Sequence, residues 1–208
     1  MAAEGELSPR KRPRQRRSQE TVAAILEAGA RIFAERGFAG GTTNHIAETA
    51  GVSVGSLYEY FPNKGAILVA NAQRQLDRMI EQVQQAIGQG SSDEPLAQLL
   101  ARFVGTMLDV HEAEPELHRV LFGEAPHPSE LHACVLQMEE TLAHTIEERL
   151  AASPEVTTRD TDTAAHLSVQ TVEALTHRFV HHGIHDLGRD AFIEEVVALL
   201  RSYLSSPP

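Results

Sequence analysis

Hydroxyl, aromatic and cationic side chains gather in residues 42–64, TTNHIAETAGVSVGSLYEYFPNK. Such groups donate to phosphate oxygens and donate to or accept from base edges, and a lysine supplies a charge that attracts phosphate. No H-E-x-x-H sequence, glycine-rich phosphate loop or paired-carboxylate site accompanies them in the sequence. The pattern therefore favours a binding protein over an enzyme.

Two short helices joined by a tight turn are predicted to position these side chains. Thr42 or Thr43 can cap the first helix, and Gly51 can end it in the left-handed conformation. Ser53 is placed to cap the second helix. The apolar residues that then share the buried side are Ile46, Ala47, Ala50, Leu57 and Phe61. A unit of this kind buries one face and presents the other, as a helix-turn-helix does.

Residues 18–68 resemble the DNA-binding domain of the tetracycline-repressor (TetR) family of bacterial one-component regulators. The matching residues are Ile25, Ala28, Phe33, Gly37, Thr42, Thr43, Ile46, Ala47, Ala50, Gly51, Val52, Ser53, Gly55, Leu57, Tyr58, Tyr60, Phe61, Lys64 and Leu68. The resemblance implies a homodimer that binds a double-stranded DNA operator and carries a larger ligand-binding domain. It also implies that the last two helices of each subunit form a four-helix dimer interface.

The DNA contacts are expected on the second helix of this motif and on its flanks. The expected contact residues are Thr43, Ser53, Val54, Gly55, Ser56, Tyr58, Tyr60 and Lys64, with Arg14, Arg16 and Arg17 from the basic N-terminal segment. Tyr58 and Tyr60 could instead complete the small core, an alternative that applies more to Tyr58. Glu59 would repel phosphate, so it is either turned aside or accepts from a cytosine amino group.

Charge is distributed unevenly along the chain, whose net charge is −11. Residues 1–68 hold nine Lys or Arg and seven Asp or Glu, whereas residues 69–208 hold nine and twenty-two. The basic excess lies in residues 1–17, which we predict to be a disordered arm. The arm either neutralises DNA phosphates or enters a minor groove, or it is a solubilising tail.

The remaining pattern predicts an all-α chain of about nine helices. Residues 18–66 would form the three-helix DNA-binding domain, and residues 67–208 the larger ligand-binding and dimerisation domain. Helices are expected near residues 18–36, 64–89, 95–112, 129–152, 158–182 and 189–204, with a short helix after Pro115. One cysteine, Cys134, and no apolar run of the roughly 20 residues that a membrane span needs indicate a cytoplasmic protein without a membrane partner.

The larger domain is expected to bind a small hydrophobic or amphipathic molecule. The expected pocket residues are Met79, Val83, Phe103, Met107, Val135, Met138 and Val172. The last helix carries two overlapping apolar stripes, one more than packing on its own domain requires. The expected dimer interface consists of Phe179, Phe192, Val196, Leu200 and Tyr203.

Histidines crowd the end of the helix at 158–182: His177, His181, His182 and His185. His177 and His181 have a spacing that can chelate a metal, but cations are also favoured at a helix C-terminus. We therefore expect no metal and no cofactor. The predicted function is a DNA-binding transcriptional repressor that a small ligand releases from its operator, with activation left open as an alternative. The alternatives are a helix-turn-helix protein with a metal- or cofactor-dependent helical domain, and a DNA-binder without a ligand.

Overall fold

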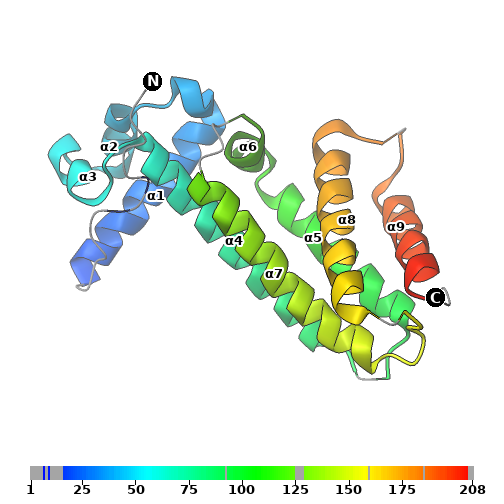
Figure 1. Cartoon of the computed structure of the whole chain (residues 1–208). Coiled ribbons are helices and arrows are strands. Elements are labelled where there is room, and N and C mark those ends of the chain that lie inside the picture. Colours follow the sequence, from blue (N-terminus) through cyan, green and yellow to red (C-terminus); the bar gives the residue numbers. More distant parts are fainter. Residues whose placement is uncertain are drawn as a thin grey trace. The chain divides into compact units, whose positions relative to one another are not determined.

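The computed structural model describes residues 7, 9, 16–91, 93–124, 129–158, 160–184 and 186–205. These residues form helices joined by short connections, and no strand occurs among them (Figure 1). The all-α fold class predicted from the sequence is thus confirmed. Within the same residues, no helix is both long enough and apolar enough to cross a membrane.

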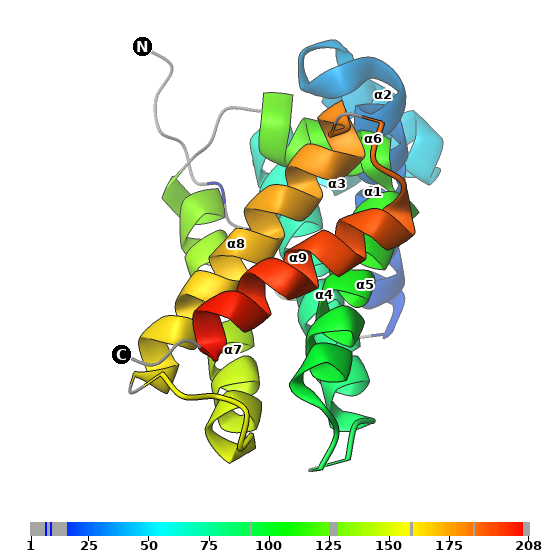
Figure 2. The ribbon, with the colours of Figure 1, turned by 90° about the vertical axis from the view of Figure 1, so that its right-hand side faces the viewer.

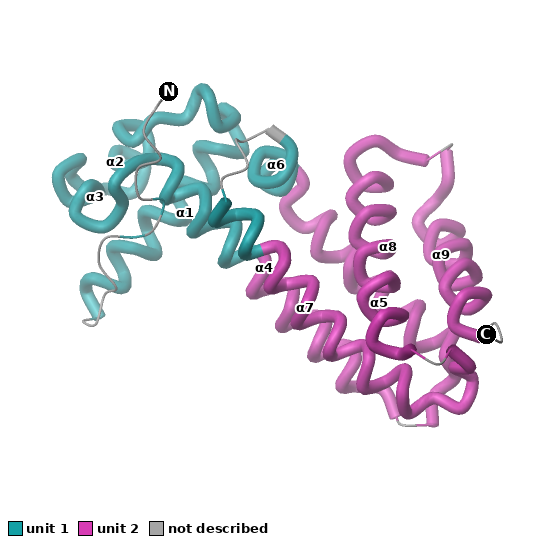
Figure 3. Tube along the Cα trace, viewed as in Figure 1, with its two compact units in different colours: residues 1–75, 116–134 teal, residues 76–115, 135–208 magenta. Residues whose placement is uncertain are grey.

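Two compact units make up the chain, and one of them is discontinuous (Figure 3). Unit 1 comprises residues 1–75 and 116–134, and unit 2 comprises residues 76–115 and 135–208. The sequence predicted a border between residues 66 and 67 instead. The division differs because the apolar core of unit 1 includes residues that lie beyond that border: Ile67, Leu68, Ala72, Leu117, Val120, Leu121 and Leu131.

Unit 1 is built from helices that bury one apolar side each. They are α1 (Arg16–Gly40), α2 (Thr43–Ala50), α3 (Val54–Tyr60), the first part of α4 (Lys64–Gly88), α6 (Pro115–Arg119) and the π-helix η1 (Val120–Glu124). α1 runs beyond its predicted end, but its backbone breaks at Gly37, where φ is 67° and ψ is 173°. Gly29 lets α1 approach α4, because a Cβ there would lie 2.6 Å from Ile67 Cγ2.

Unit 2 contains the rest of α4 together with α5 (Leu96–Ala113), most of α7 (Ser129–Ala152), α8 (Thr161–His182) and α9 (Arg189–Leu204). α5 is buried along most of its length and packs against both α8 and α9. Figure 2 shows α8 and α9 next to each other.

A buried carboxylate fastens the connection between α4 and α5. The side chain of Glu94 is only 8% exposed and pairs with both Arg102 and Arg149. Arg149 also donates to the carbonyls of Gly90 and Ser91, at 3.1 and 2.7 Å. Charge-assisted hydrogen bonds therefore hold this connection in place.

Candidate nucleic-acid interface

Side-chain caps fix both helices of the predicted motif. Thr42, rather than Thr43, is the N-cap of α2, and its hydroxyl accepts from the backbone N–H of His45 at 3.2 Å. Gly51 ends α2 in the left-handed conformation, with φ 68°. The hydroxyl of Ser53 accepts from the backbone N–H of Ser56 at 3.0 Å and so caps α3. These caps leave Thr43 free of capping and direct its side chain elsewhere.

Thr43 and Tyr58 join the two helices on their exposed side. The Thr43 hydroxyl lies 3.1 Å from the Tyr58 hydroxyl, and Tyr58 is 40% exposed. Tyr60, in contrast, is half-buried and packs against the core that contains Leu57 and Phe61. The expectation that Tyr58 is the more core-like tyrosine is therefore wrong: Tyr60 packs against the core, whereas Tyr58 is exposed with its hydroxyl beside that of Thr43.

The outer face of α3 is open and carries little bulk. Val54, Gly55, Tyr58 and Glu59 are exposed, whereas Leu57 is fully buried. A Cβ added at Gly55 would meet no atom closer than the Ser53 hydroxyl at 3.8 Å. An extended ligand can therefore approach the backbone of α3 at its first turn.

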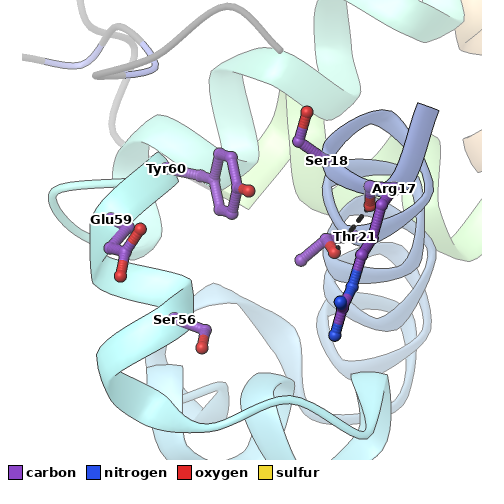
Figure 4. Close-up of a pocket in the computed structure, with 6 residues that line it drawn as sticks. All are labelled: Arg17, Ser18, Thr21, Ser56, Glu59 and Tyr60. Atoms are coloured by element: carbon purple, nitrogen blue, oxygen red, sulfur yellow. Dashed lines mark hydrogen bonds between the residues drawn. The ribbon is translucent and has the colours of Figure 1, made fainter. Parts of the chain in front are cut away.

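A polar hollow of about 280 Å³ separates the start of α1 from α3 (Figure 4). Its lining residues are Arg17, Ser18, Thr21, Ser56, Glu59 and Tyr60. Three of the expected DNA contacts, Arg17, Ser56 and Tyr60, thus line one hollow. Arg16 instead pairs with Glu20 at 3.0 Å on an exposed turn, and Arg14 lies outside the described residues.

Lys64 has a structural role that the sequence analysis missed. Its ammonium donates to the carbonyls of Phe38 and Gly41, at 2.6 and 3.0 Å, and to that of Ala39 at 3.3 Å. It also lies 4.5 Å from the centroid of the Phe38 ring. All three N–H donors are thereby used at the end of α1. The signal in the sequence was a cation that follows a glycine-punctuated helix end, where free carbonyls collect.

The expected pocket residues lie in the interior of unit 2. Val135 is half-buried, and the other six are buried: Met79, Val83, Phe103, Met107, Met138 and Val172. These side chains thus belong to the apolar interior of this unit. Their role in ligand binding stays a prediction.

The expected dimer interface needs a correction. Phe192, Val196 and Leu200 are 2%, 4% and 3% exposed and are buried within the chain itself. Phe179 is also occupied, because its ring stacks on that of Phe192 with centroids 4.3 Å apart. Of the five expected residues, only Tyr203 is exposed, at 41%. Three α9 residues that were expected to contact a partner therefore pack inside the unit instead.

Other apolar residues of α8 and α9 remain exposed. Leu199 is 53% exposed and Leu167 is 45% exposed, and both helices that carry them belong to unit 2. Leu199 and Tyr203, four positions apart, share one side of α9, and Leu167 is exposed on α8.

A buried histidine of α5 meets the histidine-rich end of α8. His111 is fully buried, its Nδ1 lies 2.8 Å from the Met107 carbonyl, and its Nε2 lies 3.3 Å from Glu173 Oε1. Burial disfavours the imidazolium, but the hydrogen bond and charge of Glu173 outweigh it, so the pKa of His111 is raised above 6.5. Burial lowers the pKa of His177. Sequence reasoning missed Glu173, although it lies one helical turn before His177; His185 lies outside the described residues.

Two family models match the chain. Residues 25–70 match the model described as "Bacterial regulatory proteins, tetR family", and residues 95–204 match "Tetracyclin repressor-like, C-terminal domain". The second match alone spans more than half of the sequence. The chain belongs to the TetR family. The resemblance seen in the sequence is thus confirmed, and the TetR assignment identifies a helix-turn-helix transcriptional regulator.

Parts of this TetR-family chain are similar in sequence to known bacterial regulators. It is 34% identical over 84 residues to an uncharacterised HTH-type transcriptional regulator of Mycobacterium tuberculosis, which is 40% of this chain and 43% of that protein. It is 28% identical over 88 residues to the fatty acid metabolism regulator protein of Bacillus subtilis, which is 42% of this chain and 45% of that protein. The chain thus matches less than half the length of these relatives.

A solved structure extends the likeness to the whole fold. The transcriptional regulator FadR from Bacillus subtilis, solved in complex with stearoyl-CoA, has a TM-score of 0.70 and 22% identity. The alignment covers 86% of this chain and 97% of that one. At this identity the likeness concerns the fold alone.

Proposed function

We propose that the protein is a homodimeric transcriptional repressor that is released from a DNA operator by an amphipathic small molecule with a long acyl chain. The observation that carries the proposal is the exposed outer face of α3. Ser53 caps this helix and buried Leu57 anchors its inner side, so the outer face is accessible to a DNA groove. Membership of the TetR family supports DNA as the partner of this face.

The DNA contacts divide into two kinds. Phosphate contacts are expected from Thr43, Tyr58 and Arg17, which bear hydroxyl or guanidinium donors on the exposed side of unit 1. Base contacts are expected from the first turns of α3, where Gly55 leaves space and Ser56 can donate or accept. Glu59 lines the same hollow as Arg17 and is suited to accept from a cytosine amino group.

The class of ligand is inferred from chemistry and from relatives. The expected pocket residues are aliphatic, aromatic or thioether side chains, which suit an acyl chain. One relative is a fatty acid metabolism regulator, and the FadR fold neighbour was solved with stearoyl-CoA. Ligand and DNA then oppose each other by linkage, each weakening the other's binding by the same factor.

The dimer is proposed to use the face formed by Leu167, Leu199 and Tyr203, which replaces the buried stripe predicted from the sequence. A two-fold dimer places two copies of α3 on one duplex. The operator should therefore be palindromic, with half-sites about one helical turn or more apart.

Selection from a pool of random DNA duplexes tests the DNA-binding part. We expect enrichment of a palindromic sequence, whereas recovery of unrelated sequences would contradict the proposal. Fluorescence anisotropy on the selected site then tests the ligand. Stearoyl-CoA should weaken DNA binding by about 5–150-fold, the usual range of such coupling, and coenzyme A without the acyl chain serves as the control.

Transcription in vitro from a promoter that overlaps the selected site tests the sign of regulation. We expect the protein to lower transcript yield and stearoyl-CoA to restore it. A rise in transcript on addition of the protein would instead identify an activator.

A further inference from the structure

The hydroxyl of Thr176 differs from other hydroxyls in the helices of unit 2. Thr106 and Ser168 each donate to the carbonyl four residues earlier, at 2.8 and 2.7 Å, which is the local way for a helix to satisfy a hydroxyl. Thr176 lies on the same buried face of α8 as Ser168 and is fully buried. Within the described part of the chain, its Oγ1 has no hydrogen-bond partner. The Thr176 hydroxyl thus retains both its donor and its acceptor capacity.

A carboxylate oxygen one helical turn earlier is in the same state. Glu173 lies three positions before Thr176, a spacing that makes two side chains neighbours on a helix surface. Its Oε1 lies 3.3 Å from Nε2 of His111. The side chain as a whole is 22% exposed, but its Oε2 is buried and has no hydrogen-bond partner among the described residues. Buried polar groups without a partner are costly, and in native proteins they mark a bound water molecule or ligand.

The chemistry of these two groups selects what can satisfy them. A carboxylate oxygen only accepts, whereas a threonine hydroxyl both donates and accepts. An alcohol fits both, because its O–H donates to Glu173 Oε2 while its oxygen accepts from Thr176 Oγ1. A ligand carboxylate or carbonyl would instead present lone pairs to Glu173 and be repelled. An ammonium is far costlier to bury than a neutral hydroxyl.

The two groups lie next to residues that are proposed to contact the acyl chain. Val172 precedes Thr176 by one turn of α8, and Met107 precedes His111 by one turn of α5. Both Val172 and Met107 are buried, and α5 packs against α8 inside unit 2. A substituent on an acyl chain held by these apolar side chains would therefore lie close to Glu173.

We propose that Glu173 and Thr176 bind a hydroxyl group carried by the acyl chain of the ligand, so that hydroxylated acyl chains are preferred over unsubstituted ones. This inference rests on the proposed function, which assigns an acyl ligand to unit 2. In the absence of ligand, one buried water molecule can meet the same hydrogen-bonding needs. A ligand hydroxyl takes the place of that water and keeps its hydrogen bonds, which an unsubstituted methylene cannot do.

Isothermal titration calorimetry of the full chain tests the preference without DNA. The probes are stearoyl-CoA and three hydroxystearoyl-CoA isomers, with the hydroxyl at the β carbon, in mid-chain or at the ω carbon. We expect one isomer to bind wild type at least about tenfold more tightly than stearoyl-CoA, because hydrogen bonds to charged groups are the stronger kind.

Two substitutions that preserve side-chain shape locate the hydroxyl. Thr176→Val and Glu173→Gln should each reduce the preference for that isomer by about 3–10-fold, since each removes or weakens one hydrogen bond. Circular dichroism of each variant establishes that the helices are intact. An undiminished preference in Thr176→Val would overturn the inference.

Ser168→Ala is the matched control. It removes a buried hydroxyl from the same face of α8, but one that already donates to the Ala164 carbonyl. This variant should keep the wild-type preference. If wild type bound stearoyl-CoA at least as tightly as every isomer, the inference would be wrong and the proposed function would stand, with water satisfying Glu173 and Thr176. If none of these acyl-CoAs bound, both would be overturned.

Discussion

At the scale of single residues, the same side-chain type performs different tasks in unit 1. Arg17 lines an open hollow, whereas the Lys64 ammonium donates hydrogen bonds to three carbonyls at the end of α1. The sequence placed both among the DNA contacts because both are cations near a recognition helix. The two cations differ in what they contact. The partners of Lys64 lie more than twenty residues away in the sequence, so local spacing cannot reveal them.

Lys64→Met tests this division. The change removes the ammonium and leaves three carbonyls without their donor, so we expect unit 1 to lose about 1–3 kcal/mol of stability. The measurement is thermal unfolding followed by circular dichroism, beside the salt dependence of DNA binding.

Arg17→Met is the matched control. It should leave the melting temperature unchanged and lower the slope of log affinity against log salt by about one phosphate contact. If Lys64→Met also kept its melting temperature and lowered that slope, the ammonium would be a DNA contact after all.

His166 supplies a titration that can be observed directly. The hydrogen bond that His166 donates from Nε2 to the Glu140 carboxylate, at 3.0 Å, raises the pKa of His166 above 6.5, and the hydrogen bond from Nδ1 to the Asp162 carbonyl contributes further. Because the folded-state pKa is the higher one, this stabilisation is full below about pH 6.5. It is lost as the pH rises through the folded-state pKa.

Glu140→Gln should bring the pKa of His166 down towards its ordinary value, as followed by the chemical shifts of the ring in an NMR titration. Glu148→Gln, which changes a carboxylate beside the exposed His144, is the control and should leave His166 unchanged. An unaltered titration of His166 in Glu140→Gln would show that the pair does not form in solution.

At the scale of elements, neighbouring residues were sufficient to predict the helix caps. They were not sufficient to predict the contacts between elements. The caps of α2 and α3 and the left-handed Gly51 follow from neighbouring residues, and the structure has them where the spacing predicts. The two stripes of α9 have the same period and similar composition, so the sequence alone gave no reason to choose between them. The structure buries Phe192, Val196, Leu200 and Leu204, which come from both stripes, in a helix that packs against α5 and α8.

Aspartate at two adjacent positions of α9 separates core from interface. Leu200→Asp places a carboxylate at a site only 3% exposed and should unfold unit 2. Leu199→Asp changes a residue that is 53% exposed, so the fold should persist while the dimer dissociates. Analytical ultracentrifugation and circular dichroism distinguish the two outcomes. A stable dimer of folded Leu199→Asp would move the interface away from this face.

α4 contributes to both units and has no proline or glycine between Ala66 and Ile87. We therefore propose that this stiff helix couples ligand binding in unit 2 to DNA binding by unit 1. Arg74→Gly combined with Asp77→Gly softens the helix at two exposed positions near the unit border and preserves its register. We expect both units to stay folded and to keep their ligands, but stearoyl-CoA should no longer release DNA.

Alanine at the same two positions is the control for α4, because it removes the same side chains and keeps the helix stiff. The alanine pair should respond to stearoyl-CoA as wild type does. Release of DNA from the glycine pair with the wild-type coupling would show that α4 is not the lever.

At the scale of the whole molecule, charge and chain topology matter most. The net charge of −11 hides a first third that is not acidic, and only the division of the sequence revealed a region able to approach DNA. The topology was less accessible to sequence reasoning. Pro126 and Pro128 indicate a break, but nothing local indicates that Leu117, Val120 and Leu121 complete the core of unit 1.

That return of the chain affects how hybrid regulators can be made. A single crossover between two relatives near residue 66 or residue 75 would join one parent's helix-turn-helix to the other parent's segment 116–134. The apolar core would then be assembled from mismatched halves, and Leu131 would meet side chains it had not been selected with. A working chimera therefore needs the transplanted DNA-reading half to bring segment 116–134 with it, through three crossovers rather than one.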